Sequence, residues 1–160
     1  MKIGIVSDTH SRKIPQQLID DFKSVDFIVH AGDFCSLKDL EVFQKLKDVK
    51  AVYGNMDESS LRGKLSSRLI FSFGSFQIGL YHGSGPGNRV LDSVQEEFKN
   101  DKVDGVIFGH SHQPLNKVID DVLYFNPGSP NDTVVAPYCS YGILEIINNK
   151  LVGTIIKVKS

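Results

Sequence analysis

The chain has 160 residues, of which 41% are hydrophobic and 23% are charged, and its formal net charge is −1. This composition excludes a disordered chain and a membrane-embedded protein, and the scattered basic residues give no stripe that would grip nucleic acid. No apolar run approaches the roughly 20 residues of a membrane span and no signal-like core precedes the first strand, so we expect one cytoplasmic domain over residues 1–160.

The first two thirds of the chain alternate between strand and helix patterns. Short apolar runs rich in β-branched residues predict strands at 2–7, 26–31, 49–53, 77–81 and 103–108. Apolar residues at helical spacing predict helices at 18–25, 37–46 and 90–98. This alternation indicates a sheet with parallel strands and covering helices.

The last third is mostly β in pattern. It predicts strands at 122–125, 141–147 and 151–158, with a turn at 148–150 between the last two. Irregular loops are expected at 84–88 and 127–137. An α/β domain with two packed sheets flanked by helices accommodates both parts of the chain.

Metal-competent side chains follow the predicted strands of the first two thirds. Ligands of open α/β sheets bind beyond the carboxyl ends of the strands, so residues far apart in sequence converge there. Oxygen and imidazole donors suit manganese, iron, zinc or nickel. Because the donors are too many for one ion, two ions that share a carboxylate are the economical arrangement. The predicted ligands are Asp8, His10, Asp33, Asn55, His82, His110 and His112.

The ordered set Asp-x-His, Gly-Asp, Gly-Asn, His-Gly and Gly-His-x-His resembles the calcineurin-like metallophosphoesterases. The short chain with Asn126-Pro127-Gly128-Ser129 looks like their small bacterial and archaeal phosphodiesterase branch, and the resemblance runs from Met1 to about Ile147. It implies a four-layer α-β-β-α sandwich of two mixed sheets flanked by helices, the metallo-dependent phosphatase fold. By resemblance, one ion is held by Asp8, His10, Asp33 and His112, and the other by Asp33, Asn55, His82 and His110, with Asp33 bridging.

This resemblance implies a metal-dependent phosphoesterase, and we expect a phosphodiesterase. A hydroxide held between the two ions would attack phosphorus in line, while Asn55 and His110 help to position the phosphoryl group. Manganese is the first candidate metal, with nickel, iron and zinc as alternatives. The expected substrate is a small phosphoester, which includes nucleotide-type esters, and no membrane partner is expected. The resemblance also implies a homodimer.

Position 56 departs from the family pattern. Many members have a histidine directly after the Gly-Asn pair, where it contacts substrate and protonates the leaving group, whereas this chain has Met56 followed by Asp57. A thioether does neither, so we expect a preference for esters with good leaving groups. The loop after Ser129 also lacks the arginine associated with close relatives.

Several residues have a structural interpretation beside the functional one. We expect His30 to be a hydrogen-bonded structural histidine or a support for a ligand. Cys35 and Cys139 have no CxxC spacing and are expected to be small buried residues. Asp57 either accepts a hydrogen bond from a ligand or merely shapes its loop. The segment 126–129 has the composition of a tight turn.

Two alternatives to a phosphodiesterase remain open at the level of sequence. One is a catalytically weak or inactive protein-binding scaffold on the same fold, as in the retromer subunit that looks like these enzymes. The other is a phosphomonoesterase or protein phosphatase, which shares the site but ordinarily uses the histidine that Met56 replaces.

Overall fold

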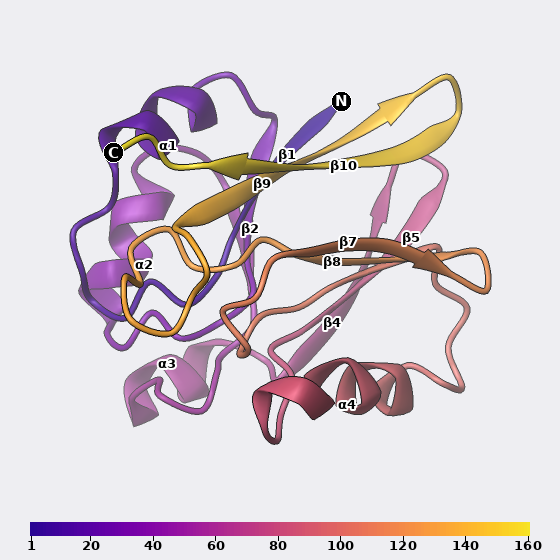
Figure 1. The fold of residues 1–160 in the computed structure, drawn as a ribbon, viewed down its shortest axis with the longest axis horizontal. Helices are drawn as coiled ribbons and strands as arrows, with labels where there is room; N and C mark the ends of the chain where they lie inside the picture. The colour runs from indigo at the N-terminus through magenta and orange to yellow at the C-terminus, as the bar shows by residue number, and fades with distance from the viewer.

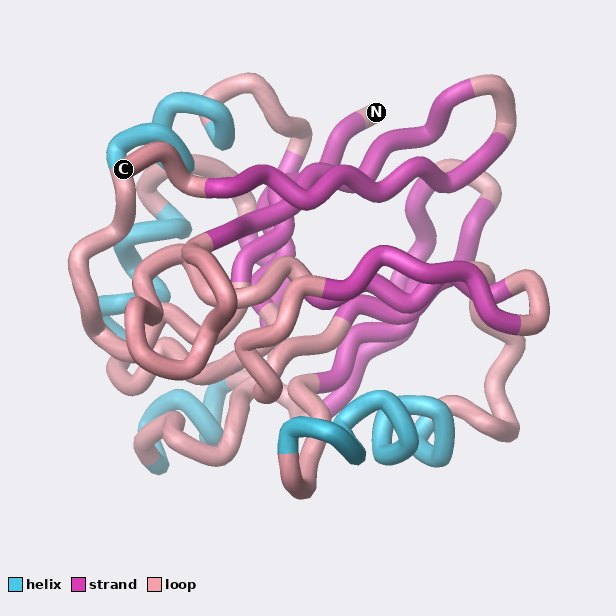
Figure 2. The backbone as a smooth tube through the Cα atoms, viewed as in Figure 1, coloured by secondary structure: helices cyan, strands magenta, loops and turns pink.

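The computed structural model describes residues 1–160 and contains two five-stranded sheets with helices on their outer faces (Figures 1 and 2). The strands are β1 Lys2–Val6, β2 Phe27–His30, β3 Val49–Ala51, β4 Arg68–Phe73, β5 Phe76–Tyr81, β6 Gly105–Ile107, β7 Leu115–Ile119, β8 Val122–Asn126, β9 Ser140–Ile147 and β10 Lys150–Lys157. The helices are α1 Gln16–Phe22, α2 Leu37–Gln44, α3 Ser59–Lys64 and α4 Val90–Glu97, with a 3-10 turn at Gly87–Arg89.

Both sheets are mixed. The first has the order β10-β9-β1-β2-β3, in which β1, β2 and β3 are parallel and β9 and β10 are antiparallel additions at one side. The second has the order β4-β5-β6-β8-β7, in which β5, β6 and β8 are parallel and each edge strand is antiparallel to its neighbour. The parallel strands of each sheet therefore deliver their carboxyl ends to one edge.

Three groups of buried side chains hold the layers together. The inner faces of the two sheets meet in a core that includes Ile5, Val29, Leu80 and Phe125. Helices α1 and α2 cover the outer face of the first sheet, and α4 covers the outer face of the second, where Val94 contributes to the core. The resulting order of layers is α-β-β-α, the architecture that the sequence predicted (Figure 1).

All the predicted strands and the three predicted helices are present, but three further elements were missed. Helix α3 has a single buried apolar side chain, Leu61, so its sequence carries no helical stripe. Strands β4 and β7 are sheet edges. Strand β7 has no buried residue and a weak apolar pattern, whereas β4 was missed although Leu69, Phe71 and Phe73 alternate toward the core. The short loop between β4 and β5 contains Gly74 at φ +59, which makes the tight reversal possible.

Other local expectations have mixed outcomes. The turn at 148–150 is present, with Asn148 and Asn149 both at positive φ, as hairpin turns require. The loop at 127–137 is irregular, whereas the loop at 84–88 runs into the 3-10 turn. The burial expected for the cysteines is wrong: Cys35 and Cys139 lie in loops and are both partly exposed. No helix has the length and apolar character that crossing a membrane demands.

Candidate metal centre

The predicted ligands gather where the parallel strands of both sheets end. Asp8 follows β1, Asp33 follows β2 and Asn55 follows β3 of the first sheet. His82 follows β5, and His110 and His112 follow β6 of the second sheet. The site therefore lies across the seam between the two sheets.

The first group of ligands joins Asp8 and His10 to His112. The Nε2 atom of His112 lies 3.4 Å from Asp8 Oδ1, and the Nε2 atom of His10 lies 3.7 Å from the same oxygen. The two Nε2 atoms are 3.3 Å apart. Such donor atoms, all within 4.8 Å of one another, have the spacing of side chains that surround one cation.

The second group consists of Asp33, His82 and His110. The Nε2 atom of His82 lies 3.4 Å from Asp33 Oδ2 and 3.2 Å from His110 Nδ1. The amide oxygen of Asn55 is 3.1 Å from each of these two histidine nitrogens. Asn55 therefore adds an oxygen donor to the second group.

Asp33 is placed between the two groups. Its Oδ2 atom is 3.4 Å from His82 Nε2 in the second group and 3.6 Å from His10 Nε2 in the first. Asp8 Oδ1 is in turn 3.8 Å from His82 Nε2. All seven predicted ligands thus lie in one cluster, with a carboxylate at its centre.

A divalent cation fits this donor set. Asp8 is fully buried, and its Oδ1 atom has no hydrogen-bond partner. A buried carboxylate oxygen without a partner is costly, and a cation removes that cost. The Oδ1 atom faces three imidazoles, which are neutral ligands for the same ions.

The outer nitrogen of three histidines is bound to a protein acceptor. His82 Nδ1–H donates to the carbonyl of Ala31 at 2.7 Å, and His110 Nε2–H donates to the carbonyl of Gly85 at 2.9 Å. His112 Nδ1–H donates to the Asp132 carboxylate at 2.5 Å. Because one nitrogen of each ring carries the donated proton, the other presents a lone pair to the centre.

In the metal-free protein, nearby carboxylates favour the protonated forms of two histidines of this site. Burial alone would lower the pKa of His82, but Asp33 and Asp8 outweigh it and raise the pKa to about 9. His112 behaves alike, because Asp8 and Asp132 outweigh burial and raise its pKa to about 9. Burial raises the pKa of Asp8, but the neighbouring imidazoles of His10, His112 and His82 outweigh it and hold the pKa far below its usual range. A metal ion would therefore have to displace protons from the imidazoles of His82 and His112.

The backbone of the ligand loops is unusual. Five ligands have φ between +47° and +69°, a conformation that non-glycine residues rarely adopt and that gathers at functional sites. They are Asp8, His10, Asp33, His110 and His112. A side chain at Gly54 would overlap the Asp33 carboxylate, and one at Gly109 would overlap Ser7 and Asp8. The Gly-Asn and Gly-His motifs thus require glycine because neighbouring atoms lie where a side chain would be.

Asp57 supports two ligand loops at once. Its buried carboxylate accepts hydrogen bonds from the backbone N–H groups of Asp33, Cys35 and Gly54 at 2.9, 2.7 and 2.7 Å. Asp57 does accept a hydrogen bond from a predicted ligand, through the backbone N–H of Asp33, and the same set of bonds also shapes its loop. This single side chain ties the loop after β2 to the loop after β3.

His30 is fully buried and stacks on Phe34 with ring centroids 3.5 Å apart. Burial lowers its pKa to about 3, so the ring is neutral. Its Nδ1 atom accepts from the N–H of Gly32, so Nε2–H donates to Thr9 Oγ1 at 3.1 Å. His30 is therefore a structural histidine that supports the loop carrying Asp8 and His10.

The segment after β8 is more than a tight turn. The Asn126 side chain donates to the carbonyl of Gly109 and to Ser111 Oγ, both in the loop of His110 and His112. The Ser129 hydroxyl donates to the carbonyl of Asp8 at 2.8 Å. This segment consequently joins the ligand loops of the two sheets.

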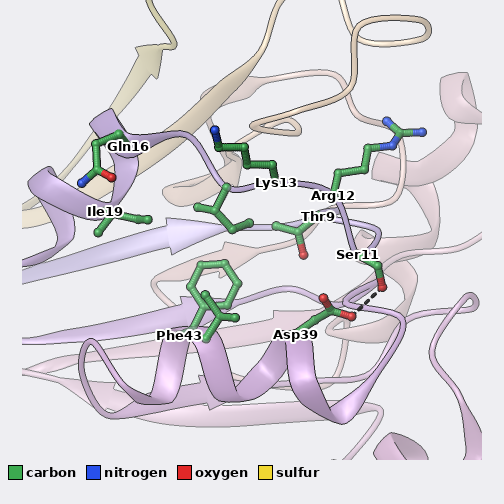
Figure 3. Close-up of a pocket in the computed structure, with 10 residues that line it drawn as sticks. Thr9, Ser11, Arg12, Lys13, Gln16, Ile19, Asp39 and Phe43 are labelled. Atoms are coloured by element: carbon green, nitrogen blue, oxygen red, sulfur yellow. Dashed lines mark hydrogen bonds between the residues drawn. The ribbon is translucent and has the colours of Figure 1, made fainter.

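Two residues near the centre were missed from the sequence. Asp132 binds His112, and Arg62 lines a cavity together with the ligands Asn55 and His82. Neither belongs to a motif or stands directly at the end of a predicted strand, so no pattern marked them. Another cavity, of about 370 Å³, lies beside the loop of His10 (Figure 3), where Ser11 donates a hydrogen bond to Asp39 of α2; none of the seven ligands lines it.

Comparisons with known proteins identify the family of this chain. A family model described as "Calcineurin-like phosphoesterase superfamily domain" matches residues 1–149. A protein of Methanothermobacter thermautotrophicus named "Probable metallophosphoesterase" is 37% identical over 134 residues, which are 81% of this chain and 77% of that one. A phosphodiesterase of Methanocaldococcus jannaschii is 34% identical over 142 residues, 80% of this chain and 83% of that one. The chain belongs to the calcineurin-like phosphoesterase superfamily.

Solved structures extend the likeness in fold. The crystal structure of Vps29 from Chaetomium thermophilum superposes with a TM-score of 0.80 at 18% identity, covering 99% of this chain and 95% of that one. At this identity the comparison supports the fold alone, and it agrees with the four layers described above.

Proposed function

We propose that this protein hydrolyses phosphoesters, phosphodiesters in particular, with two divalent metal ions held by the seven ligands. The observation that carries the proposal is the position of Asp33. Its Oδ2 atom lies within 3.6 Å of a histidine nitrogen from each ligand group, which suits a carboxylate shared by two ions. Manganese is the first metal to test, as one of the divalent ions that carboxylate, amide and imidazole donors suit.

The residues divide into two ligand sets in this proposal. Bound ions would supply an activated water molecule and neutralise negative charge on the phosphoryl oxygens. Asp8, His10 and His112 would hold one ion, His82, His110 and Asn55 the other, and Asp33 both.

Asn55 and His110 have a second role in the proposal. Asn55 is exposed and His110 is partly exposed, so both border the solvent from which a substrate arrives. The Asn55 amide oxygen faces His82 and His110, which leaves its Nδ2 group to donate a hydrogen bond to a phosphoryl oxygen. Both side chains thus orient the group that reacts.

Met56 favours diesters with good leaving groups as substrates. The residue is 58% exposed, and its backbone N–H donates to Asp33 Oδ1 at 2.9 Å. A thioether offers no proton to a departing alkoxide. Esters whose leaving group is already stable as an anion need no such proton.

Hydrolysis of bis-p-nitrophenyl phosphate by manganese-loaded protein tests the proposal. Asp33→Asn removes the shared charge, so the variant should lose nearly all metal-dependent turnover. The matched control is Asp48→Asn, an exposed residue outside the site. Full activity of Asp33→Asn would refute the bridging role. No turnover of any mono- or diester at saturating manganese would refute the enzymatic proposal and favour the scaffold alternative.

A further inference from the structure

A cavity of about 300 Å³ opens directly beside the second ligand group. Asn55 and His82 line it together with Tyr53, Tyr81 and Arg62. The cavity is thus continuous with the proposed reaction centre. A group attached to a phosphorus atom at that centre would have space here, between aromatic rings that provide apolar surface.

Arg62 is held in place at this cavity by three contacts. Its Nε–H donates to the carbonyl of Asp57 and its Nη2–H donates to the carbonyl of Asn55, each at 3.0 Å. The guanidinium also lies over the ring of Tyr53, with its central carbon 5.3 Å from the ring centroid. A side chain ordered in this way loses little further freedom when it binds a ligand.

The positive charge of Arg62 has no carboxylate partner. Arg68 pairs with Glu97 and Asp101, and Arg89 pairs with Asp92, but Arg62 forms no ion pair. Its two fixed donors point to neutral carbonyl groups, which leaves the Nη1 group available. An ordered guanidinium without a counter-ion, at the wall of a cavity that contains metal ligands, is suited to an anionic ligand.

We infer that this cavity is a substrate subsite and that Arg62 selects phosphoesters whose substituent carries a second anionic group, a carboxylate or phosphate, on or beyond an aromatic ring. The inference rests on the proposed function and names its substrate class. The Nη1 group of Arg62 donates to the second anion, while Tyr53 and Tyr81 pack against the ring. Asn55 and His82 keep the ester itself at the metal centre.

Arg62 also has a structural effect, because it binds two carbonyl groups of the loop that carries Asn55. A purely structural role predicts that removing Arg62 reduces turnover of all esters by the same factor. A subsite role predicts a loss confined to esters with the second anion. The ratio between two matched substrates therefore separates the roles.

The substrates are methyl 4-carboxyphenyl phosphate and its neutral isostere methyl 4-carbamoylphenyl phosphate, with manganese-loaded protein. The unmodified protein should prefer the carboxylate ester, chiefly through KM. In Arg62→Gln, which keeps a donor for the loop carbonyls, the ratio of kcat/KM values should fall about tenfold, as expected for one charge-assisted hydrogen bond. Lys64→Ala, at an exposed lysine of the same helix, should leave the ratio unchanged.

Binding to the metal-free protein gives a readout independent of turnover. The anion 4-hydroxybenzoate should shift the backbone amide signals of Tyr53 and Tyr81 in nuclear magnetic resonance spectra, and Arg62→Gln should weaken this binding about tenfold. The neutral 4-hydroxybenzamide should bind equally weakly to both proteins. The subsite proposal would be overturned if the ratio of kcat/KM values were the same in the unmodified protein and in Arg62→Gln. It would also be overturned if both proteins bound 4-hydroxybenzoate with the same affinity. If neither ester is hydrolysed but benzoate binding depends on Arg62, the proposed function fails while the anion site stands.

Discussion

The Asp132 carboxylate, in the loop between β8 and β9, accepts a hydrogen bond from the Nδ1–H group of His112. Asp132 is itself fixed, because its oxygens also accept backbone N–H groups of Val134, Val135 and Ala136 at 2.8 to 3.1 Å. This loop contains no metal ligand, yet it determines which nitrogen of His112 faces Asp8.

Replacing Asp132 should weaken metal binding at the first ligand group. In Asp132→Asn the neutral amide no longer fixes the ring and its tautomer, so manganese affinity should fall about 10- to 100-fold. Isothermal titration calorimetry measures this change. Asp121→Asn, at an exposed turn residue, is the control. Unchanged affinity in Asp132→Asn would show that His112 is oriented without Asp132.

Position 56 should control the balance between monoesters and diesters. A histidine there would provide a proton for the leaving group beside Asp33, so Met56→His should raise turnover of p-nitrophenyl phosphate more than that of bis-p-nitrophenyl phosphate. Steady-state kinetics with both esters measures the ratio. Met56→Gln, a residue without a titratable proton, is the control. An equal change in both rates would contradict this interpretation of Met56.

Metal affinity should rise with pH through the neutral range. The pKa values of His82 and His112 in the metal-free protein are about 9, so below that pH a metal ion must displace their protons. Affinity should therefore increase from pH 6.5 toward pH 9, and calorimetry in two buffers of different ionisation enthalpy should detect proton release. Constant affinity and no proton release over this range would contradict the competition.

Asp57 should contribute strongly to stability. In Asp57→Ala, three backbone N–H groups near Asp33 and Gly54 lose their acceptor. The free energy of unfolding should fall by roughly 2–4 kcal/mol, the cost of buried donors without partners. Urea denaturation of the metal-free protein measures it, with the exposed Asp48→Ala as control. A decrease within about 0.5 kcal/mol would place Asp57 among ordinary surface residues.

The sequence predicted the fold well in the fully buried parallel strands and poorly at the edge strands β4 and β7 and in α3. The parallel strands are buried on both faces, so their apolar runs were plain, as in the strand that contains Ile28 and Val29. Edge strands such as β7 have exposed residues on both faces and no such pattern. Helix α3 escaped prediction because one buried leucine does not define a stripe.

The candidate site divides in a similar way. The seven predicted ligands follow strand ends, and strand ends of one edge meet by topology, so chain order alone predicted that they converge. Asp132 and Arg62 reach the centre from a loop and a short helix. Their positions depend on hydrogen bonds between loops, such as that from Asn131 to the carbonyl of Thr9, and no local pattern encodes such contacts.

Each of the two ligand groups takes side chains from both sheets. Ions bound there would act as cross-links, pinning one half of the sandwich to the other at a single end. Loading with manganese would then raise the midpoint of thermal unfolding. A chelator would loosen the seam at this end first, and backbone amides after β1 and β6 would exchange with solvent sooner than those at the opposite end.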